Sequence, residues 1–390
     1  IFKNFENFWN ENEIKQKAKA YHNYFENPEQ EGEFSWVNEK DKDNLKKKTI
    51  EKSMKWGIPN HILGDIDKAK FIIGLLNPGI NMTKKDAEKC ETIGTYIKNE
   101  MNEEMGENRD LVIRTEEKKY KIPFPGSSKE VYEEKSNKEL NIYDFYYNHI
   151  LDKENVLSQE LKKLYKLYNE NIENIDIFED LRNHKIGPKE DRIAHPLKNF
   201  AYYFYAYYKG CFDSSSQIKA AIDHYENIFQ KINKAKEKTD KKKIDQKFEK
   251  ALFEMPITNI ELIPYRSEKA PKNIWLESSK VSANAIIEKI MQDKDTVVIL
   301  RSYDRQEEED KENKYNWKKL FEKICEEKNI DFKKYIEPSI YIFNGQNGAI
   351  SIGNINPASD NSIKSKEQVI KELNESINLS DFEKELDNNY

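Results

Sequence analysis

The stretch Lys70-Phe-Ile-Ile-Gly-Leu-Leu-Asn-Pro-Gly79 decides the fold. Its apolar run is short, unbroken and closed by a turn sequence, which is typical of a strand buried on both faces of a parallel sheet. Three later segments share this character: residues 257–263, 296–300 and 339–343. Helical periodicity precedes the last two of them, over residues 281–291 and 317–327. Strands that alternate with helices predict an α/β fold with a four-stranded parallel sheet flanked by helices.

The spacing of these strands predicts how the chain is divided. About 170 residues separate the first strand from the second, far more than a crossover connection needs. Leucines at helical spacing and an aromatic stretch over residues 201–208 predict that this part is a large α-helical insertion with its own small core, added to the sheet. The expected units are an N-terminal helical region (1–64), an α/β core (65–84 and 251–357), the insertion (85–250) and a C-terminal helical tail (358–390).

The composition limits the classes of function. Lys and Arg number 65 and Asp and Glu 71, so the net charge is −6 and DNA binding would need a local basic patch. The best local candidate is the lysine run at residues 241–243. Three scattered cysteines and six scattered histidines predict reduced thiols, no metal site and no cofactor. No stretch resembles a membrane span or a signal peptide, so we expect a soluble, cytoplasmic protein without a membrane partner.

The carboxyl ends of the four predicted strands are the place to look for a ligand site, because parallel α/β sheets bind ligands there. All four ends are polar or form turns: Asn77-Pro78-Gly79, Pro264-Tyr265-Arg266-Ser267, Arg301-Ser302 and Asn344-Gly345-Gln346-Asn347-Gly348. We predict that their side chains cluster at one edge of the sheet. Turns favour Asn, Pro and Gly for backbone reasons as well, and an arginine at a strand end can bind a ligand or form an ion pair, so both interpretations stay open.

Taken in order, the segments resemble the uracil-DNA glycosylase superfamily, nearest to its mismatch-specific uracil/thymine branch. The resemblance is carried by Gly74-Leu75-Leu76-Asn77-Pro78-Gly79, by Ile257-Thr258-Asn259-Ile260 and by the loop over residues 344–351. It covers the first strand and roughly residues 255–355. It implies that Asn77 is catalytic and holds the attacking water, a task that an Asp could also perform. It also implies that Gly345, Gly348 and Ser351 grip phosphates through backbone amides.

The resemblance implies a base-binding pocket as well. Its substrate-binding residues would be Leu76, Pro78, Gly79, Phe124, Asn259, Tyr265, Arg266, Arg301, Asn344, Gly345, Gln346, Asn347, Gly348 and Ser351. Phe124 would stack on the base. The chain departs from the family where Leu75 replaces a usual Gly, where Gln346-Asn347 replaces a His-Pro-Ser core, and where no acidic residue directly follows Asn77.

Three functions are therefore open. The resemblance implies a DNA glycosylase-like protein that recognises a modified or deaminated base and could excise it, in repair or in anti-phage defence, with the insertion offering a protein-partner surface. The departures favour a catalytically inactive glycosylase-fold module that binds nucleic acid or a protein. A third class is an enzyme acting on a small nucleotide. The aromatic residues 201–208 could stack on bases or pack a core, and His195 could be a general acid or structural.

Overall fold

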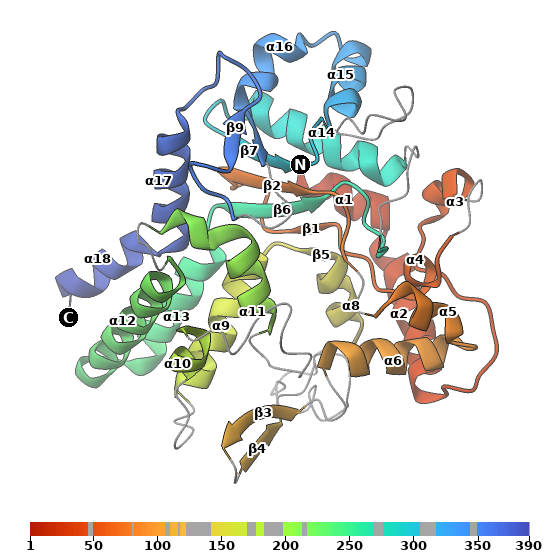
Figure 1. The fold of residues 1–390 in the computed structure, drawn as a ribbon, viewed down its shortest axis with the longest axis horizontal. Coiled ribbons are helices and arrows are strands. Elements are labelled where there is room, and N and C mark those ends of the chain that lie inside the picture. The colour runs from red at the N-terminus through yellow and green to blue at the C-terminus, as the bar shows by residue number, and fades with distance from the viewer. Residues whose placement is uncertain are drawn as a thin grey trace.

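The computed structural model describes residues 1–45, 50–79, 82–105, 110–115, 118–121, 142–169, 177–182, 198–212, 217–268, 276–304, 317–343 and 349–389. A central β-sheet runs through these segments, and helices lie on both sides of it (Figure 1). The predicted α/β class is therefore confirmed.

The sheet has seven strands in the order β5-β1-β6-β2-β7-β8-β9. The four predicted strands are all present and mutually parallel: β2 (Phe71–Leu75), β6 (Ile257–Glu261), β7 (Val297–Arg301) and β8 (Ile340–Phe343). The sheet is nevertheless mixed and wider than the predicted four strands, because β1 (Ile62–Leu63), β5 (Leu151–Asp152) and β9 (Ile355–Pro357) extend it. Both β1 and β9 pair antiparallel to their inner neighbours. These strands have two or three residues, too few to give a hydrophobic pattern.

The order in which strands are added to the sheet reverses at β2. This first parallel strand pairs with β6 on one side and with β7 on the other. Right-handed crossovers then require the β2–β6 connection to cover one face and the later connections to cover the opposite face. The helices α14 (Glu277–Gln292) and α15 (Trp317–Glu327), which connect β6 to β7 and β7 to β8, follow this rule. The reversal creates a switch point between β2 and β7 at their carboxyl ends.

Each face of the sheet carries one hydrophobic core. Alternate residues of β2 divide between them: Phe71, Ile73 and Leu75 join the core on the insertion face, and Ile72 joins the other. The insertion face is covered by α9 (Val156–Asn169), α11 (Lys198–Tyr203), α12 (Gln217–Lys238) and α13 (Lys241–Phe253), with the C-terminal helices α17 (Lys366–Ile377) and α18 (Ser380–Asn389). The opposite face packs on α14, α15 and the N-terminal helices α1 (Phe2–Trp9) and α2 (Glu11–Glu26).

The insertion does not have a core of its own, and that expectation is wrong. Leu157, Leu161 and Leu164 of α9 belong to the same continuous core as Ile73 of β2. Strand β5, which lies within the insertion, also pairs with β1 and so completes one edge of the sheet. The physical reason is the connection itself: a crossover from β2 to β6 must cross a sheet face whose apolar side chains need a cover.

The remaining elements lie around this framework (Figure 1). They are α3 (Glu39–Leu45), α4 (Lys52–Trp56), α5 (Lys84–Lys89), α6 (Ile93–Met105), α8 (Ile142–Ile150), α10 (Ile177–Arg182), the π-helix η1 (Phe204–Tyr208), the 3-10 helices η2 (Lys209–Cys211) and η3 (Glu337–Ser339), α16 (Phe332–Tyr335) and the antiparallel pair β3 (Asp110–Thr115) and β4 (Lys118–Lys121). In the described part of the chain, no helix combines the length and the apolar character needed to cross a membrane.

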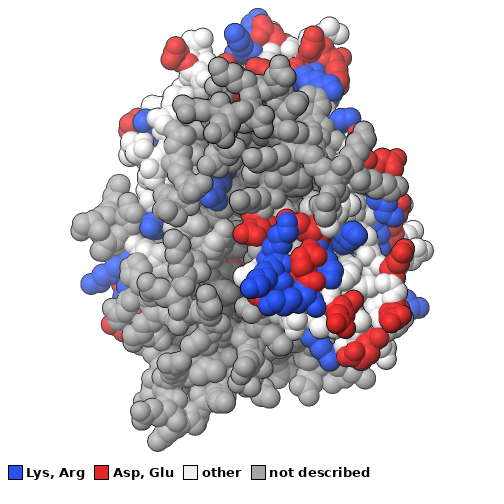
Figure 2. Space-filling view, turned by 45° about the vertical axis from the view of Figure 1, so that its right-hand side comes forward, with Lys and Arg blue, Asp and Glu red and all other residues white. Residues whose placement is uncertain are grey.

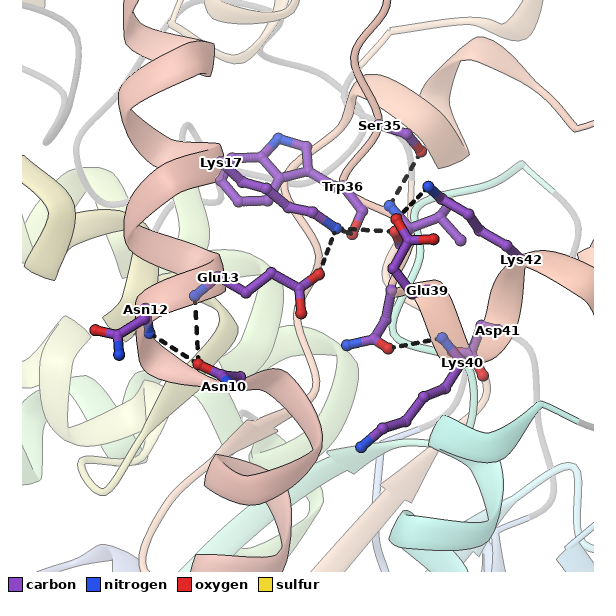
Figure 3. Close-up of polar contacts among 12 residues, drawn as sticks. Asn10, Asn12, Glu13, Lys17, Ser35, Trp36, Glu39, Lys40, Asp41 and Lys42 are labelled. Carbon is purple, nitrogen blue, oxygen red and sulfur yellow. Dashed lines mark hydrogen bonds and ion pairs between the residues drawn. The ribbon is translucent and has the colours of Figure 1, made fainter.

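Polar contacts order the start of the chain (Figure 3). The side chain of Asn10 caps α2 by accepting hydrogen bonds from the backbone amides of Asn12 (3.1 Å) and Glu13 (3.4 Å). One α-helical turn later, Lys17 donates to the carbonyl oxygen of Val37 (2.9 Å) and pairs with Glu13 (3.1 Å). Burial of its stem lets Lys17 hold the loop before α3 against α2.

The junction between β1 and β6 offers a test of the sheet. Gly64 has a φ of 121°, and a Cβ placed there would lie 2.4 Å from the carbonyl oxygen of Ile257 and 2.6 Å from Cα of Thr258. Because both are backbone atoms of β6, we expect Gly64→Ala to lower the free energy of unfolding by at least about 2 kcal/mol. Gly353→Ala is the control, since nothing lies within 4 Å of its Cβ position. Equal denaturant midpoints for the two variants would contradict this account.

Candidate functional site

Side chains from the carboxyl ends of the central strands face the insertion together. The register pairs Leu75 with Glu261 and Gly74 with Leu300, so Glu261 and Arg301 stand on either side of β2. Adjacent strands are about 4.8 Å apart, which separates the two backbones by roughly 10 Å. Asn259 lies one row deeper on the same face, paired with Ile73. This edge is the switch point at which a ligand is expected.

Asn77 is the second residue after β2, and its amide joins this strand end to the loop after β6. Its Nδ2 donates to the carbonyl oxygens of Ser267 (2.9 Å) and Pro78 (3.0 Å) and lies 3.2 Å from Ser267 Oγ. Carbonyl oxygens only accept hydrogen bonds, so these partners fix which way the amide points. Among the described residues, none donates to Asn77 Oδ1. The amide oxygen is thus oriented and available to accept from a water molecule or a ligand.

Arg266 connects three segments of the protein. Its Nε donates to the carbonyl oxygen of Ile58 (2.9 Å), its Nη1 to that of Gly79 (3.2 Å) and its Nη2 to Nε2 of His149 (3.0 Å). The imidazole can accept only while that nitrogen is unprotonated. Burial, together with the charge of Arg266, lowers the pKa of His149 to about 3. The guanidinium therefore serves the architecture of the loops, and a phosphate contact would compete with these bonds.

Tyr265 does not join the strand-end cluster, contrary to prediction. Its ring belongs to the core on the opposite face of the sheet. Its Oη donates to Asp41 (2.7 Å) and accepts from the backbone amide of Asn38 (3.0 Å). Asp41 also accepts from the amide of Ser278 (3.1 Å) at the start of α14. The apolar core of the N-terminal helices therefore determined the direction of this side chain.

Two polar residues of β6 are buried with unpaired atoms. Asn259 and Glu261 are each 7% exposed. Within the described residues, no hydrogen bond of normal geometry reaches Nδ2 or Oδ1 of Asn259, or Oε2 of Glu261. Burial raises the pKa of Glu261 to about 8, although the charges of Arg266 and Arg301 act in the opposite direction. The carboxyl group is thus mostly protonated at neutral pH, which is characteristic of functional sites.

The π-helix η1 covers this end of the sheet from the insertion side. Arg301 Nη1 donates to Oη of Tyr207 (3.3 Å), and the backbone amide of Ile350 donates to the carbonyl oxygen of Tyr207 (2.8 Å). Burial raises the pKa of Tyr207, and among the neighbouring groups Glu261 raises it further. Phe204, Tyr207 and Tyr208 are buried in the core on the insertion face, as the core-packing alternative for residues 201–208 predicted. π-Helices are rare and occur frequently at functional sites.

The other predicted site residues lie as follows. Leu76 is half-buried against the core of the opposite face, Pro78 is buried and Gly79 is exposed. The carbonyl oxygen of Ser351 accepts from the amides of Asn354 and Ile355, each at 3.0 Å. Several predicted residues lie outside the described part of the chain: Phe124, His195, Asn344, Gly345, Gln346, Asn347 and Gly348.

Sequence reasoning missed Glu261, and it predicted neither the backbone conformation of Ser302 nor the position of Tyr207 over Arg301. A signal for Glu261 was present, because Asn259-Ile260-Glu261 alternates polar and apolar residues along a strand predicted as an apolar run. Ser302 follows β7 with a φ of 63°, a left-handed conformation that is uncommon for a non-glycine residue and occurs at functional sites. No sequence signal places Tyr207 over Arg301, since the two are distant in the chain.

The described residues contain no group of three or more His, Cys, Asp or Glu side chains that could hold a metal ion. Cys90, Cys211 and Cys325 are all buried and unpaired by disulfides. The chemistry of the site thus has to be argued from its amide, carboxyl, phenol and guanidinium groups.

Two buried neutral histidines predict sensitivity to acid. Burial lowers the pKa of His61 and of His149 from 6.5 to about 3. Below pH 6.5 the unfolded chain therefore binds protons that the folded chain does not, and the free energy of unfolding falls by up to about 1.4 kcal/mol per pH unit for each histidine, down to about pH 3. His149→Gln keeps an acceptor for Arg266 and should remove about half of this contribution. Denaturant titrations across pH measure it, and an unchanged pH slope in the variant would contradict the assignment.

Comparisons with known proteins add no assignment to this geometry. No protein-family model, no curated protein and no solved structure matches the chain.

Proposed function

We propose that the protein is a DNA glycosylase-like hydrolase that recognises a modified or deaminated base in DNA and excises it. The observation that carries the proposal is the oriented amide of Asn77 at the end of β2. Its Nδ2 is held by the carbonyl oxygens of Ser267 and Pro78, which turns Oδ1 away from them. A glycosylase that uses a neutral residue to position water needs such an acceptor beside its base pocket, as the resemblance to the uracil-DNA glycosylase superfamily implies.

The reaction makes modest demands on the side chains. The bond between the base nitrogen and the sugar carbon breaks, and its electron pair leaves with the base. Water then adds to the oxocarbenium-like sugar and gives up a proton, so the base and the sugar hydroxyl together account for the elements of water. An amide oxygen can orient that water without ionising, and it places no negative charge near the DNA phosphates. The base itself must be extruded from the helix before it can reach the edge of the sheet.

The surface charge bears on the substrate class. Figure 2 shows lysine and arginine side chains gathered in one group, with acidic side chains within and beside it. On α4, α5 and the segment before α4, Lys84 pairs with Glu51 (2.8 Å) and Lys89 with Asp86 (2.7 Å). The lysines at residues 241–243 are exposed at the start of α13. DNA binding by such a surface would be of modest strength and would depend on a few local contacts.

A second candidate function is a catalytically inactive module that binds nucleic acid or a protein. The observation that favours it is the engagement of Arg266, whose three donor positions reach Ile58, Gly79 and His149 within the protein. The interspersed surface charges point the same way, because a mixed surface suits a protein partner at least as well as a phosphate backbone. Excision by the wild-type protein decides between the two candidates.

Asn77 provides the test of chemistry. Asn77→Ala should lower the rate of base excision by about 10²–10⁴, the range typical of a positioned catalytic group. An Asp at this position was expected to retain activity. The geometry argues against that, because a carboxylate oxygen would replace Nδ2 between two carbonyl oxygens, so Asn77→Asp should lose activity too.

Ser267→Ala is the matched control, since it removes only the contact at 3.2 Å and keeps the carbonyl partner. Activity is measured on oligonucleotides carrying uracil, mismatched thymine or modified cytosine.

Thermal melts of the same variants separate chemistry from folding. Losing the bond to Ser267 should cost about 1 kcal/mol of stability, too little to unfold the protein at the assay temperature. A proportional loss of stability and activity across all three variants would assign Asn77 a structural role. If the wild-type protein excises nothing from the whole panel, the binding-module function replaces the glycosylase.

Salt dependence tests the DNA partner separately. Each phosphate contact contributes a slope of roughly 0.9 to the fall of log affinity with log salt concentration. With Arg266 engaged internally, we expect about three contacts and a slope of about 3 in fluorescence-anisotropy titrations. If the affinity for duplex DNA does not change with salt concentration, the protein makes none of the phosphate contacts on which DNA binding depends.

A further inference from the structure

The insertion-side face of β6 holds a cluster of polar groups that lack hydrogen-bond partners among the described residues. Within the described residues, Asn259 Nδ2 and Oδ1, Glu261 Oε2 and Tyr208 Oη all lack a hydrogen bond of normal geometry. The Asn259 amide lies close enough to Tyr208 to lower a tyrosine pKa that burial has raised, through a contact outside normal hydrogen-bond geometry. These two groups therefore partly satisfy each other, and Glu261 Oε2 stays unpaired among the described residues.

Their positions explain why these groups act together. Asn259 and Glu261 are two residues apart on one strand, so they point to the same face with Cα atoms roughly 6.6 Å apart. Tyr208 comes from the π-helix η1, which covers that face. The neighbours Thr258 and Ile260 are 0% exposed, whereas Asn259 and Glu261 are each 7% exposed. The unpaired nitrogen and oxygen atoms of Asn259 and Glu261 are themselves buried, so both side chains carry their polar groups into the core.

Packing alone does not account for this arrangement. The same face carries Ile257, Ile73 and Leu75 in the same core, so leucine or isoleucine at positions 259 and 261 would extend the core without unpaired atoms. Buried polar groups are nearly always paired, and those that are not call for an explanation such as a bound ligand or ordered water. A polar pair beside the switch point, next to the oriented amide of Asn77, favours a ligand.

We infer that Glu261 is a specificity-determining residue of this site, whose carboxyl group hydrogen-bonds an uncharged, planar ligand held also by Asn259 and Tyr208. The amide of Asn259 offers both donors and an acceptor, and the protonated carboxyl group offers one of each. A heterocycle with adjacent carbonyl and N–H groups satisfies such a set. The inference deepens the proposed function, since a base extruded from DNA belongs to this class.

The charge state of Glu261 is set by groups on every side. Arg266, from the loop after β6, and Arg301 of β7 both favour the carboxylate, but burial outweighs them and raises the pKa to about 8. Burial raises the pKa of Tyr203 and of Tyr207 above the ordinary value, and the charge of an ionised Glu261 raises both further. The two phenols therefore stay neutral. Raising the pH through 8 removes the donated proton of Glu261. Ligand binding should therefore weaken about tenfold between pH 7 and pH 9.

Binding of free bases tests this inference without requiring excision. Uracil, thymine and cytosine are titrated into the full chain by calorimetry at pH 7 and pH 9. We expect at least one base to bind, with the tenfold weakening at pH 9. Glu261→Gln keeps a neutral donor and acceptor, so its affinity should change far less with pH, and it also corrects for titration of the base itself. Glu261→Leu and Asn259→Leu should each lose at least tenfold in affinity at pH 7.

Two further readouts keep the outcomes distinct. The infrared carbonyl band of a protonated carboxylic acid should be present at pH 7, disappear as the pH rises through about 8, and be absent from Glu261→Gln. Thermal melts should show Glu261→Leu at least as stable as the wild type, because an unpaired buried group has been removed. Absence of binding by all three bases, or a Glu261→Leu variant that binds like the wild type, overturns the inference. If bases bind but none is excised, the role of Glu261 stands and the proposed hydrolase is overturned. If Glu261→Leu excises bases as fast as the wild type, the proposed hydrolase stands and the role of Glu261 is overturned.

Discussion

The parallel pairing of β2 with β6 is the contact on which the rest of the structure depends. It joins two stretches of chain that the whole insertion separates. The hydrogen bonding continues past the strands, from the amide of Leu262 to the carbonyl oxygen of Leu75 and from that of Ile263 to Leu76, both at 3.0 Å. The side chain of Asn77 extends it once more to Ser267. Formation of the β2–β6 pairing therefore also places the candidate catalytic amide of Asn77 and the buried Glu261 at the same end of the sheet, on strands that the insertion connects.

Burial favours the neutral forms of His61 and Glu261, in a chain whose charged residues make up 35% of the sequence. His61 illustrates the principle: Trp9 donates to its Nδ1 (2.8 Å), so its proton is on Nε2 and faces Ser282 Oγ (2.8 Å). Ser282 in turn donates to the backbone carbonyl oxygen of Glu261 (2.8 Å). A directed chain of uncharged hydrogen bonds thus connects α1 to the strand that carries the site. The abundant charges remain at the surface, where ion pairs contribute little.

The sequence predicted those parts of the fold that local pattern determines. The four parallel strands and helices α14 and α15 follow from apolar runs and helical periodicity, and the position of Asn77 at a strand end follows from them. The three short strands β1, β5 and β9 could not be predicted, because pairing partners rather than composition define a strand of two or three residues. The directions of Tyr265 and Arg266 were equally inaccessible, since Asp41, Ile58 and His149, which hold them, come from distant segments.

The π-helix over the sheet has a consequence for how this site can change in evolution. A π-turn closes its hydrogen bonds over five residues where an α-helix uses four, so it accommodates one residue more than the helix that would otherwise continue from α11. Deleting one codon within residues 204–206 would restore α-helical spacing, and because the π-turn already absorbs the extra residue, the turns before and after it would keep their orientation. The framework of strands need not respond, because η1 belongs to the crossover. A single small deletion would thereby remove one residue from the cover of the site while leaving the sheet that supports it intact.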